Sequence, residues 1–341
     1  MEAGSLRANR GHASTVAEGK RLVCLERIGI IWLAAGLDAL VGDPAWGHPV
    51  RLMGYVIAGL ERVVRRVCRR PLALRVGGGV LVALVVGGSY LLPWWLLRAV
   101  GAKYPWLAWA LEAGLIAATV AARSLAEAAY EVYRCLQTGE LTAAREAVAG
   151  LVARDTGHLS REEVVRATVE TVAENTVDGV TAPLFYAFLG GAPLALAYRA
   201  VNTLDSMLGY RSPRYRDLGW CAAKLDDLAN FLPARLTGVL ICLAAAWLGL
   251  PAGRAWRIMR RDARRHPSPN GGFPEAAVAG ALGIRLGGVN SYGGVREFRP
   301  YLGEAEEAMG EKHILAATRL MRRTSLLALL LGSVGLWFLG L

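Results

Sequence analysis

Apolar segments of membrane-spanning length dominate this sequence. Crossing the hydrocarbon core of a bilayer takes about 20 mostly apolar residues in a helix, and segments 76–97, 106–122, 232–250 and 324–341 are clear candidates. Two further segments are compromised: 28–42 is short and contains Asp38, and 180–201 is interrupted by prolines and a Gly-Gly pair. The sequence therefore predicts an all-α, polytopic helical membrane protein with about five or six membrane segments and cytoplasmic helical loops.

The charge of the chain is compatible with a membrane and argues against nucleic acid. Charged residues make up 20% of the chain, against about 25% in soluble domains. The net charge of +11 comes from basic residues beside apolar segments, where topology determinants and lipid-headgroup contacts lie. Five scattered cysteines without a C-x-x-C pair exclude a disulfide framework and a zinc site. We expect the lipid bilayer as a partner and no nucleic acid.

Topology follows from the distribution of Lys and Arg. If all six segments span, loops 42–75, 123–179 and 251–323 hold 26 of these residues and the opposite side holds 11. The richer side should be cytoplasmic, which predicts a multi-pass protein of the cytoplasmic membrane. The basic N-terminal segment contradicts this pattern, so 28–42 is not an ordinary span. We expect residues 1–27 to form a polar, disordered tail and 28–341 to form a single integral membrane domain.

The polar segments are mostly expected to be helical. Small and apolar residues recur at helical spacing in 123–150, which predicts a helical hairpin. Ser160 followed by Glu163 is a capping-box pattern, so a helix should begin near Arg161. Stretches 265–274 and 287–294 are rich in Gly, Pro, Ser and Asn and are expected to be loops, with a helix beginning near Pro274. No strand-like alternation of any length is found.

A first group of polar residues, with Asp38, Asp43 and His48, lies at the end of segment 28–42. An ionisable residue within an apolar segment is costly, so it is a functional-site hypothesis by default. The structural alternative is that Asp43-Pro44 and His48-Pro49 end one helix and cap the next. We favour a functional role for Asp43 and His48, both as catalytic residues.

A second group combines A-R-D-T, with Arg154 and Asp155, and the carboxylates of Glu170, Glu174 and Asp178. The three acidic residues are four apart, so they would share one face of a helix. Stacked carboxylates repel unless a cation lies between them, and Mg²⁺ is a natural counter-ion. The alternative is a solvated acidic face. The interleaved Thr, Val and Ala favour a metal site.

A third group lies in 202–235. Asn202 and Asp205 are three residues apart, as are Asp227 and Asn230, so each pair would share a helix face. Acidic and amide groups beside Lys224 and Arg235 suit a metal–phosphate site. They could instead form polar contacts between membrane helices.

A fourth group is the glycine-rich P-N-G-G turn with Asn270, Gly271 and Gly272, followed by N-S-Y-G-G with Asn290 and Tyr292. A glycine-rich turn before a helix can offer backbone N–H groups to an anion. It is not a Walker A loop, and the alternative is a flexible loop. Simple alternation of spans places 202–231 opposite the other groups, so either 180–201 is broken or re-entrant or this loop dips back.

Taken together, these motifs resemble the adenosylcobinamide-phosphate synthase family of cobalamin biosynthesis (CobD/CbiB). The blocks run in order from about residue 31 to about residue 303. They are D-A-L-V-G-D-P-x-x-x-H-P-V-R-L-M-G, A-R-D-T, E-T-V-A-E-N-T-V-D-G-V-x-A-P-L-F-Y, N-T-L-D-S-M-x-G-Y, L-D-D-x-A-N-x-x-P-A-R and H-P-S-P-N-G-G-x-P-E-A-A-x-A-G-A-L-G with N-x-Y-G-G. The polar N-terminal extension is the main departure.

The resemblance implies an amide ligase. Such an enzyme joins a propionate carboxylate of adenosylcobyric acid to aminopropanol or its phosphate, and it uses ATP and a divalent metal. It also implies roles for the groups above. The carboxylates of Glu170, Glu174, Asp178, Asp205 and Asp227 supply the ligands of Mg²⁺. Phosphate charge would be offset by Lys224, Arg154 and Arg235. Substrate phosphate would be bound by the 270–272 turn with Asn290 and Tyr292. Proton transfer would fall to His48, Asp43 or Asp155. The site would face the cytoplasm.

Two alternative readings are less well supported. A metal-dependent membrane prenyltransferase needs two Asp-rich motifs with a D-x-x-x-D kernel, which the chain lacks. A membrane sensor or transporter would place polar groups within the spans, whereas here they concentrate in loops and helix ends. A homo-oligomer, or a complex with other corrinoid enzymes, is compatible with the sequence.

Overall fold

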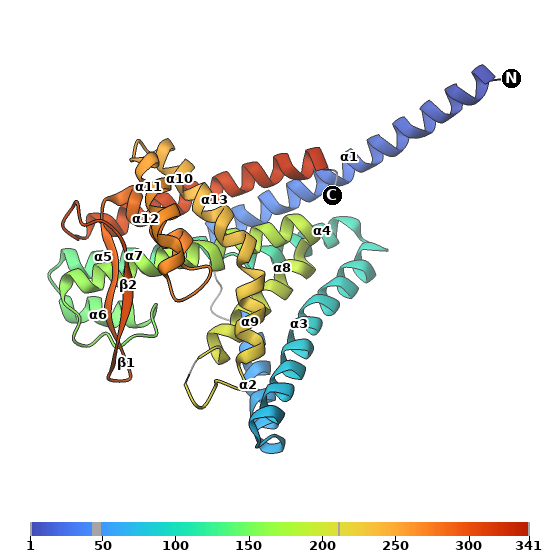
Figure 1. Cartoon of the computed structure of the whole chain (residues 1–341). Coiled ribbons are helices and arrows are strands. Elements are labelled where there is room, and N and C mark those ends of the chain that lie inside the picture. Colours follow the sequence, from blue (N-terminus) through green and yellow to red (C-terminus); the bar gives the residue numbers. More distant parts are fainter. Residues whose placement is uncertain (1, 43–48, 211, 340–341) are drawn as a thin grey trace.

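The protein is a set of packed helices with one β-hairpin (Figure 1). The computed structural model describes residues 2–42, 49–210 and 212–339, without the side chains of 2–20, 22 and 339. Asp43 and His48 therefore lie outside the described residues. The predicted all-α, polytopic membrane class is confirmed, with a hairpin that the sequence analysis did not anticipate.

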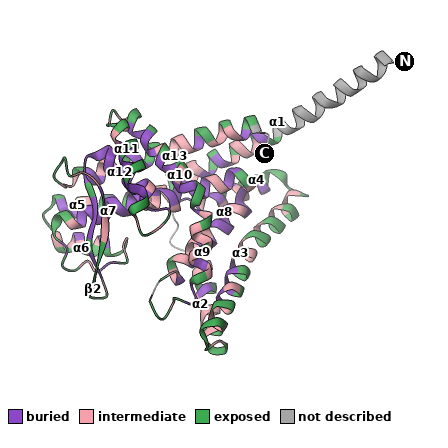
Figure 2. Ribbon diagram, in the orientation of Figure 1, coloured by how far each residue is buried: buried purple, intermediate pink, exposed green. Residues whose placement is uncertain are grey.

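The first four helices include long apolar segments in α3 and α4. The four helices are α1 (Glu2–Val41), α2 (Pro49–Val67), α3 (Pro71–Gly101) and α4 (Pro105–Ala117). α1 gives helical backbone to most of residues 1–27, where composition predicts a disordered tail. Only 22% of the most apolar part of α3 is buried inside the protein, and Figure 2 shows its long exposed face. An apolar helix that the protein leaves uncovered is suited to contact with lipid.

The predicted helices of the next polar segment are present. α5 (Ala122–Gln137) and α6 (Leu141–Ala149) form the expected hairpin, and α7 (Arg161–Thr176) begins where the capping box places it. The Ser160 hydroxyl accepts from the Glu163 backbone N–H, and the Glu163 carboxylate accepts from the Ser160 N–H. α7 continues into η1 (Val177–Thr181), a single π-helical turn. Such turns are frequent at functional sites.

The interrupted segment after η1 is a helix that folds back on itself. α8 (Ala182–Leu208) is broken at Gly190 and Gly191. Beyond the break, the Arg199 guanidinium donates to the backbone oxygen of Asp178 at 3.2 Å. In an unbroken helix these two residues would be about 30 Å apart, so the chain reverses at the glycines. The second half of α8 therefore returns toward η1.

Gly191 makes this reversal sterically possible. Its φ of 66° lies in the left-handed region, which glycine adopts without a Cβ penalty. A Cβ there would also lie 2.3 Å from the Glu112 carboxylate. That carboxylate accepts from the freed Ala192 N–H at 3.3 Å, so it satisfies a backbone group that the helix break exposes.

The remaining elements complete the fold. They are α9 (Trp220–Ala229), α10 (Phe231–Trp247), α11 (Ala252–Asp262), the 3₁₀ turn η2 (Ala263–Arg265), α12 (Gly272–Leu282), β1 (Arg285–Tyr292), β2 (Val295–Gly303) and α13 (Lys312–Leu339). α11 and α12 pack together, and α12 also packs on α10. α11 and α12 gather with α5–α7 and the β-hairpin at one end of the molecule (Figure 1).

The β-hairpin corrects the prediction of a loop at 287–294. β1 and β2 pair antiparallel, and Tyr292 opposes Val295 across a Gly293-Gly294 turn. Both turn glycines have positive φ, as a two-residue hairpin turn requires. An irregularity in the register between Leu286 and Gly288, at a Gly-Gly pair, hides the alternation that would identify the first strand.

Three helical stretches in the described part of the chain are long and apolar enough to cross a membrane: Pro71–Gly101, Pro105–Gln137 and Arg161–Leu208. α9 and α10, bent by 45° relative to each other, make a fourth if they form one broken span. The third stretch is 72% buried inside the protein in its most apolar part and folds back in α8. It is therefore an internal element rather than a lipid-exposed helix. Predicted segment 28–42 lies in α1 up to Val41, and the described part of segment 324–341 lies in α13.

Candidate active site

A cavity of about 1090 Å³ lies where segments distant in sequence meet. Its wall comes from the end of α7, η1, the end of α8, α9, the turn before α12 and the β-hairpin. Eight of the predicted site residues line it: Glu174, Asp178, Asp205, Lys224, Asp227, Asn270, Gly271 and Tyr292. The reversal in α8 explains why segment 202–231 joins the other groups, because it carries Asp205 back to Asp178.

Carboxylates dominate the cavity wall. Among the described residues, six acidic side chains line it, against three from Lys and Arg, so this part of the wall carries surplus negative charge that a bound cation would offset. Five of the six come from the helical segments: Glu174, Asp178, Asp205, Asp226 and Asp227. The side chains of Glu174 and Asp205 have no hydrogen bond within the described part of the chain. Their oxygens are available to a ligand.

Asp226 is the acidic residue that the spacing argument missed. The three-residue spacing pairs Asn230 with Asp227, but the Asn230 amide donates to Asp226 Oδ2 at 3.1 Å. The other oxygen, Oδ1, is buried and has no hydrogen-bond partner in the described residues. An unpartnered buried oxygen among carboxylates suits a hard cation with oxygen ligands, such as Mg²⁺. Among described residues no three acidic, His or Cys side chains are already gathered as ligands.

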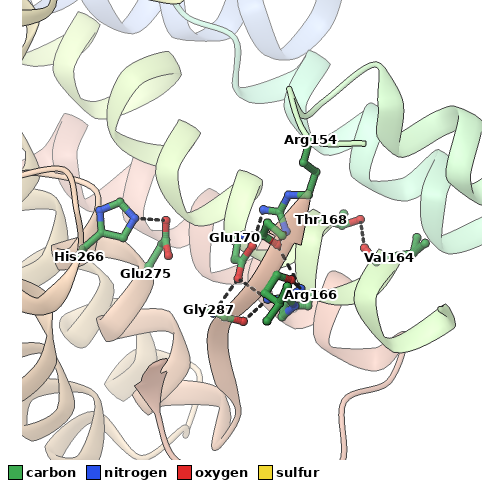
Figure 3. A network of polar contacts seen from close by, with 10 residues as sticks. Arg154, Val164, Arg166, Thr168, Glu170, His266, Glu275 and Gly287 are labelled. Atoms are coloured by element: carbon green, nitrogen blue, oxygen red, sulfur yellow. Dashed lines mark hydrogen bonds and ion pairs between the residues drawn. The ribbon is translucent and has the colours of Figure 1, made fainter. Parts of the chain in front are cut away.

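Glu170 does not face the cavity with Glu174 and Asp178. Its carboxylate accepts from Arg154 at 2.5 Å and from the Gly287 N–H of β1 at 2.8 Å. Arg154 also donates to Asn290 Oδ1 at 2.9 Å, and Arg166 bonds the Gly287 carbonyl. Figure 3 shows this network between α7 and the hairpin. The hairpin is thus held in place by the side chains of Arg154, Glu170 and Asn290, for which the sequence analysis predicted roles in metal and phosphate binding.

Asp155 holds the other end of the hairpin. Its carboxylate accepts from the Ser291 hydroxyl at 2.6 Å and from the N–H groups of Gly293 and Gly294 at 3.0 and 2.8 Å. These bonds, the one from Ser291 first, lower the pKa of Asp155 below its ordinary value. A carboxylate engaged in three hydrogen bonds is a poor proton acceptor. Asp155 therefore positions the turn that follows Tyr292.

Arg235 and Asn270 join the turn before α12 to α9 and α10. The Arg235 guanidinium stacks on Phe231 and Phe273 and donates to Asn270 Oδ1 at 3.2 Å. The Asn270 amide donates to the Asp227 carbonyl at 2.8 Å. Arg235 does not line the cavity. Its predicted phosphate role is replaced by one in shaping the wall.

The glycine-rich turn does not present its first N–H groups to an anion. The Ser268 hydroxyl accepts from the backbone N–H groups of Asn270 and Gly271 at 3.2 and 3.3 Å. The glycines serve close packing instead. A Cβ on Gly271 would lie 2.9 Å from the His266 ring, and one on Gly272 would lie 2.0 Å from the Ala263 carbonyl oxygen. The turn therefore brings α12 close to η2 and the cavity. α12 begins at Gly272, rather than near Pro274 as the sequence predicts.

Replacing Gly272 by Ala should destabilise the protein, because the new Cβ meets a backbone oxygen that cannot move freely. Overpacking of this kind costs about 1–3 kcal/mol. Gly253→Ala is a matched control near the start of α11, where a Cβ meets no atom within 4 Å. Thermal unfolding of the purified variants measures the effect. Equal unfolding temperatures for the two would show that the close approach does not exist.

His266 and Glu275 form a buried pair beside the cavity that the sequence analysis did not select. His266 Nε2 and Glu275 Oε1 lie 3.5 Å apart, as Figure 3 shows. Burial lowers the pKa of His266, and burial together with Glu170 and Glu174 raises the pKa of Glu275. The other ring nitrogen of His266 faces the Ser268 N–H at 3.1 Å. Both residues lie inside the H-P-S-P-N-G-G-F-P-E block, which was the signal for them.

These features define a helical membrane protein with one large, acid-lined cavity built at the junction of a folded-back helix and a β-hairpin. The family model described as CobD/Cbib protein matches residues 31–321, most of the chain. The protein belongs to the CobD/CbiB family, as the motif blocks indicate.

Curated relatives match over nearly their whole length. Cobalamin biosynthesis protein CobD of Klebsiella pneumoniae is 48% identical over 313 residues, which cover 91% of this chain and 97% of that protein. CobD of Citrobacter koseri is 49% identical, and the match covers 89% of this chain and 94% of that protein. Cobalamin biosynthesis protein CbiB of Salmonella typhimurium is 48% identical with the same coverage. No solved structure matches this chain.

Proposed function

We propose that this protein acts in cobalamin biosynthesis as an adenosylcobinamide-phosphate synthase. In this reaction a propionate carboxylate of adenosylcobyric acid forms an amide with aminopropanol or its phosphate, and ATP is hydrolysed. The curated relatives are cobalamin biosynthesis proteins, which supports the pathway. The observation that carries the reaction is the cavity where Glu174, Asp178, Asp205, Asp226 and Asp227 converge from four segments.

A carboxylate is a poor acyl donor, so it must first be activated. In the proposed sequence, a carboxylate oxygen of the corrinoid attacks the terminal phosphorus of ATP, which gives an acyl phosphate and ADP. The amine nitrogen then attacks the acyl carbon, phosphate leaves and the nitrogen loses a proton. Mg²⁺, when bound, would neutralise phosphate charge during the transfer.

The cavity residues have distinct parts in this proposal. Asp178, Asp205, Asp226 and Asp227 supply oxygen ligands for Mg²⁺. Lys224, which pairs with Asp227 at 3.1 Å, lies at the same wall as a cation for phosphate oxygens. His266 Nδ1 accepts from the Ser268 N–H, and its Nε2 is buried against Glu275 at 3.5 Å, so a carboxylate not engaged by metal is the better acceptor for the amine proton. Glu174 meets this condition if Mg²⁺ is held by the aspartates.

An amide-forming assay tests the proposed reaction. Purified protein in detergent or vesicles is incubated with adenosylcobyric acid, ATP, Mg²⁺ and either aminopropanol or its phosphate. We expect a product of the mass of the amide, formed only with ATP and metal and abolished by a chelator. The faster acceptor identifies the substrate. Absence of product with both acceptors, from protein that is folded by thermal unfolding, contradicts the proposal and favours a sensor role.

The acid-lined cavity also supports the predicted orientation. It is flanked by the basic 251–323 segment and by α5–α7, which belong to the loops richer in Lys and Arg. We therefore propose that the cavity faces the cytoplasm, where ATP is available. A cysteine-labelling experiment at exposed Glu162 and Arg296, in sealed inverted vesicles, would report the side directly.

A further inference from the structure

Three cationic side chains line the cavity in the described part of the chain, and they differ in their partners. Lys224 is paired with Asp227 at 3.1 Å. Arg216 lies 3.8 Å from Asp217 and is largely exposed. Arg299, on β2, is partly buried, and its guanidinium makes no hydrogen bond or ion pair within the part of the chain that the structure describes. Among the described cations at the wall, Arg299 is thus the one with neither a hydrogen bond nor an ion pair, and its guanidinium lies over the Tyr292 ring, 5.8 Å from the ring centroid.

Arg299 stays charged in this position. Burial opposes its charge, but Tyr292, Glu275 and Glu174 outweigh burial and raise the pKa of Arg299 above its ordinary value. None of these carboxylates lies within ion-pair distance of the guanidinium among the described contacts. The five N–H donors of the side chain are therefore held near acidic groups without being consumed by them.

The hairpin that carries Arg299 is fixed at both ends. At its turn, the Asp155 carboxylate accepts three hydrogen bonds. At its base, Glu170 accepts from the Gly287 N–H at 2.8 Å. Arg299 opposes Gly288 across the strands, next to this anchored base. A side chain on so firmly held a strand is pre-organised, and pre-organisation reduces the entropy lost when a ligand binds.

We propose that Arg299 binds an oxyanion of the substrate, a phosphate or a carboxylate, in the cavity that the aspartates also line. The inference rests on the proposed function, which brings such groups into the cavity. A planar guanidinium with free donors matches a phosphate or carboxylate through two parallel hydrogen bonds. It replaces Arg154 and Arg235, which the fold uses elsewhere, as the cation for the substrate.

Equilibrium binding to full-length protein, without turnover, tests this role. Three ligands with an anionic group are each compared with a counterpart that lacks this group: ATP with adenosine, aminopropanol phosphate with aminopropanol, and adenosylcobyric acid with its primary amide. Arg299→Gln should weaken the binding of one anionic ligand by about 10- to 100-fold, because hydrogen bonds to a charged group are lost. The affinity for the counterpart without the anionic group should stay unchanged. Arg299→Lys should recover part of the affinity. The ligand affected identifies the source of the oxyanion.

Arg296→Gln is the matched control, because Arg296 is an exposed arginine of the same strand that does not line the cavity. Its affinities should equal those of the unaltered protein. The inference is wrong if the Arg299→Gln variant has the unfolding temperature of the unaltered protein and binds all three anions with unchanged affinity. Arg299 then only neutralises the negative charge of Glu174 and Glu275. Failure of the proposed function gives a different result, because the unaltered protein, with Arg299 in place, then forms no amide.

Discussion

Asp205→Asn should reduce amide formation by at least about 100-fold while the protein still inserts and folds. The variant removes one negative charge from the proposed metal site, and the charge stabilisation that a metal supplies in such reactions amounts to several kcal/mol. Because the Asp205 carboxylate has no hydrogen bond in the described part of the chain, its loss removes no structural contact. Turnover of adenosylcobyric acid, with thermal unfolding measured in parallel, gives both quantities.

Asp227→Asn and Asp226→Asn extend the test along the same wall. We expect loss of turnover in both, and partial recovery at raised Mg²⁺ if the defect is weakened metal binding. Glu162→Gln is the control, since Glu162 is an exposed carboxylate in the first turn of α7. An Asp205→Asn variant that retained more than about a tenth of the activity would remove this residue from the metal role.

Arg154→Leu should destabilise the protein by about 3–5 kcal/mol, because it leaves the buried carboxylate of Glu170 without its main partner. Arg154 and Glu170 side chains are only 5% and 4% exposed, so water cannot replace the lost interaction. Denaturant or thermal unfolding of the purified protein measures the loss. The hairpin should detach as well, which hydrogen exchange at 285–303 would detect.

A double variant distinguishes an ion pair from simple packing. Replacing both Arg154 and Glu170 by Leu removes the unpaired charge, so stability should recover in part. Arg257→Leu serves as control because Arg257 is exposed on α11. A cost below about 1 kcal/mol for Arg154→Leu, the range of surface pairs, would show that the network does not hold the hairpin.

Local sequence signals identified the elements well. The Ser160–Glu163 capping box marked the start of α7 at the correct residue, since both of its hydrogen bonds lie within four residues. Helical periodicity in 123–150 likewise predicted α5 and α6. The β-hairpin was missed although Gly293-Gly294 is a hairpin turn signal, because the irregular glycine-rich first strand lacks alternation.

Eight of the sixteen predicted site residues line the cavity, but the neighbours of these residues were not predicted. Glu170, Glu174 and Asp178 share a helical spacing, yet the π-helical turn η1 changes the phase after Thr176, and Glu170 turns to the hairpin. Asp227 and Asn230 also share a spacing, yet Asn230 bonds Asp226. Spacing along a helix indicates which residues are close to one another, and it does not indicate which surface of the protein they face.

The sequence by itself determined the membrane class, the helices, the family and the acidic and basic residues that are candidates for the site. It could do so because the length of apolar segments, helix capping and the order of motifs can be read along the chain. Only the tertiary structure decided which of those residues meet. The reversal at Gly190 and Gly191 returns Asp205 to Asp178, and the anchored hairpin brings Arg299 to the same cavity while Arg154 and Glu170 become its supports. The reversal joins residues 21 apart in sequence, whereas the hairpin is held by contacts between segments more than 100 residues apart. Neither kind of contact leaves a periodic trace in the segments that make it.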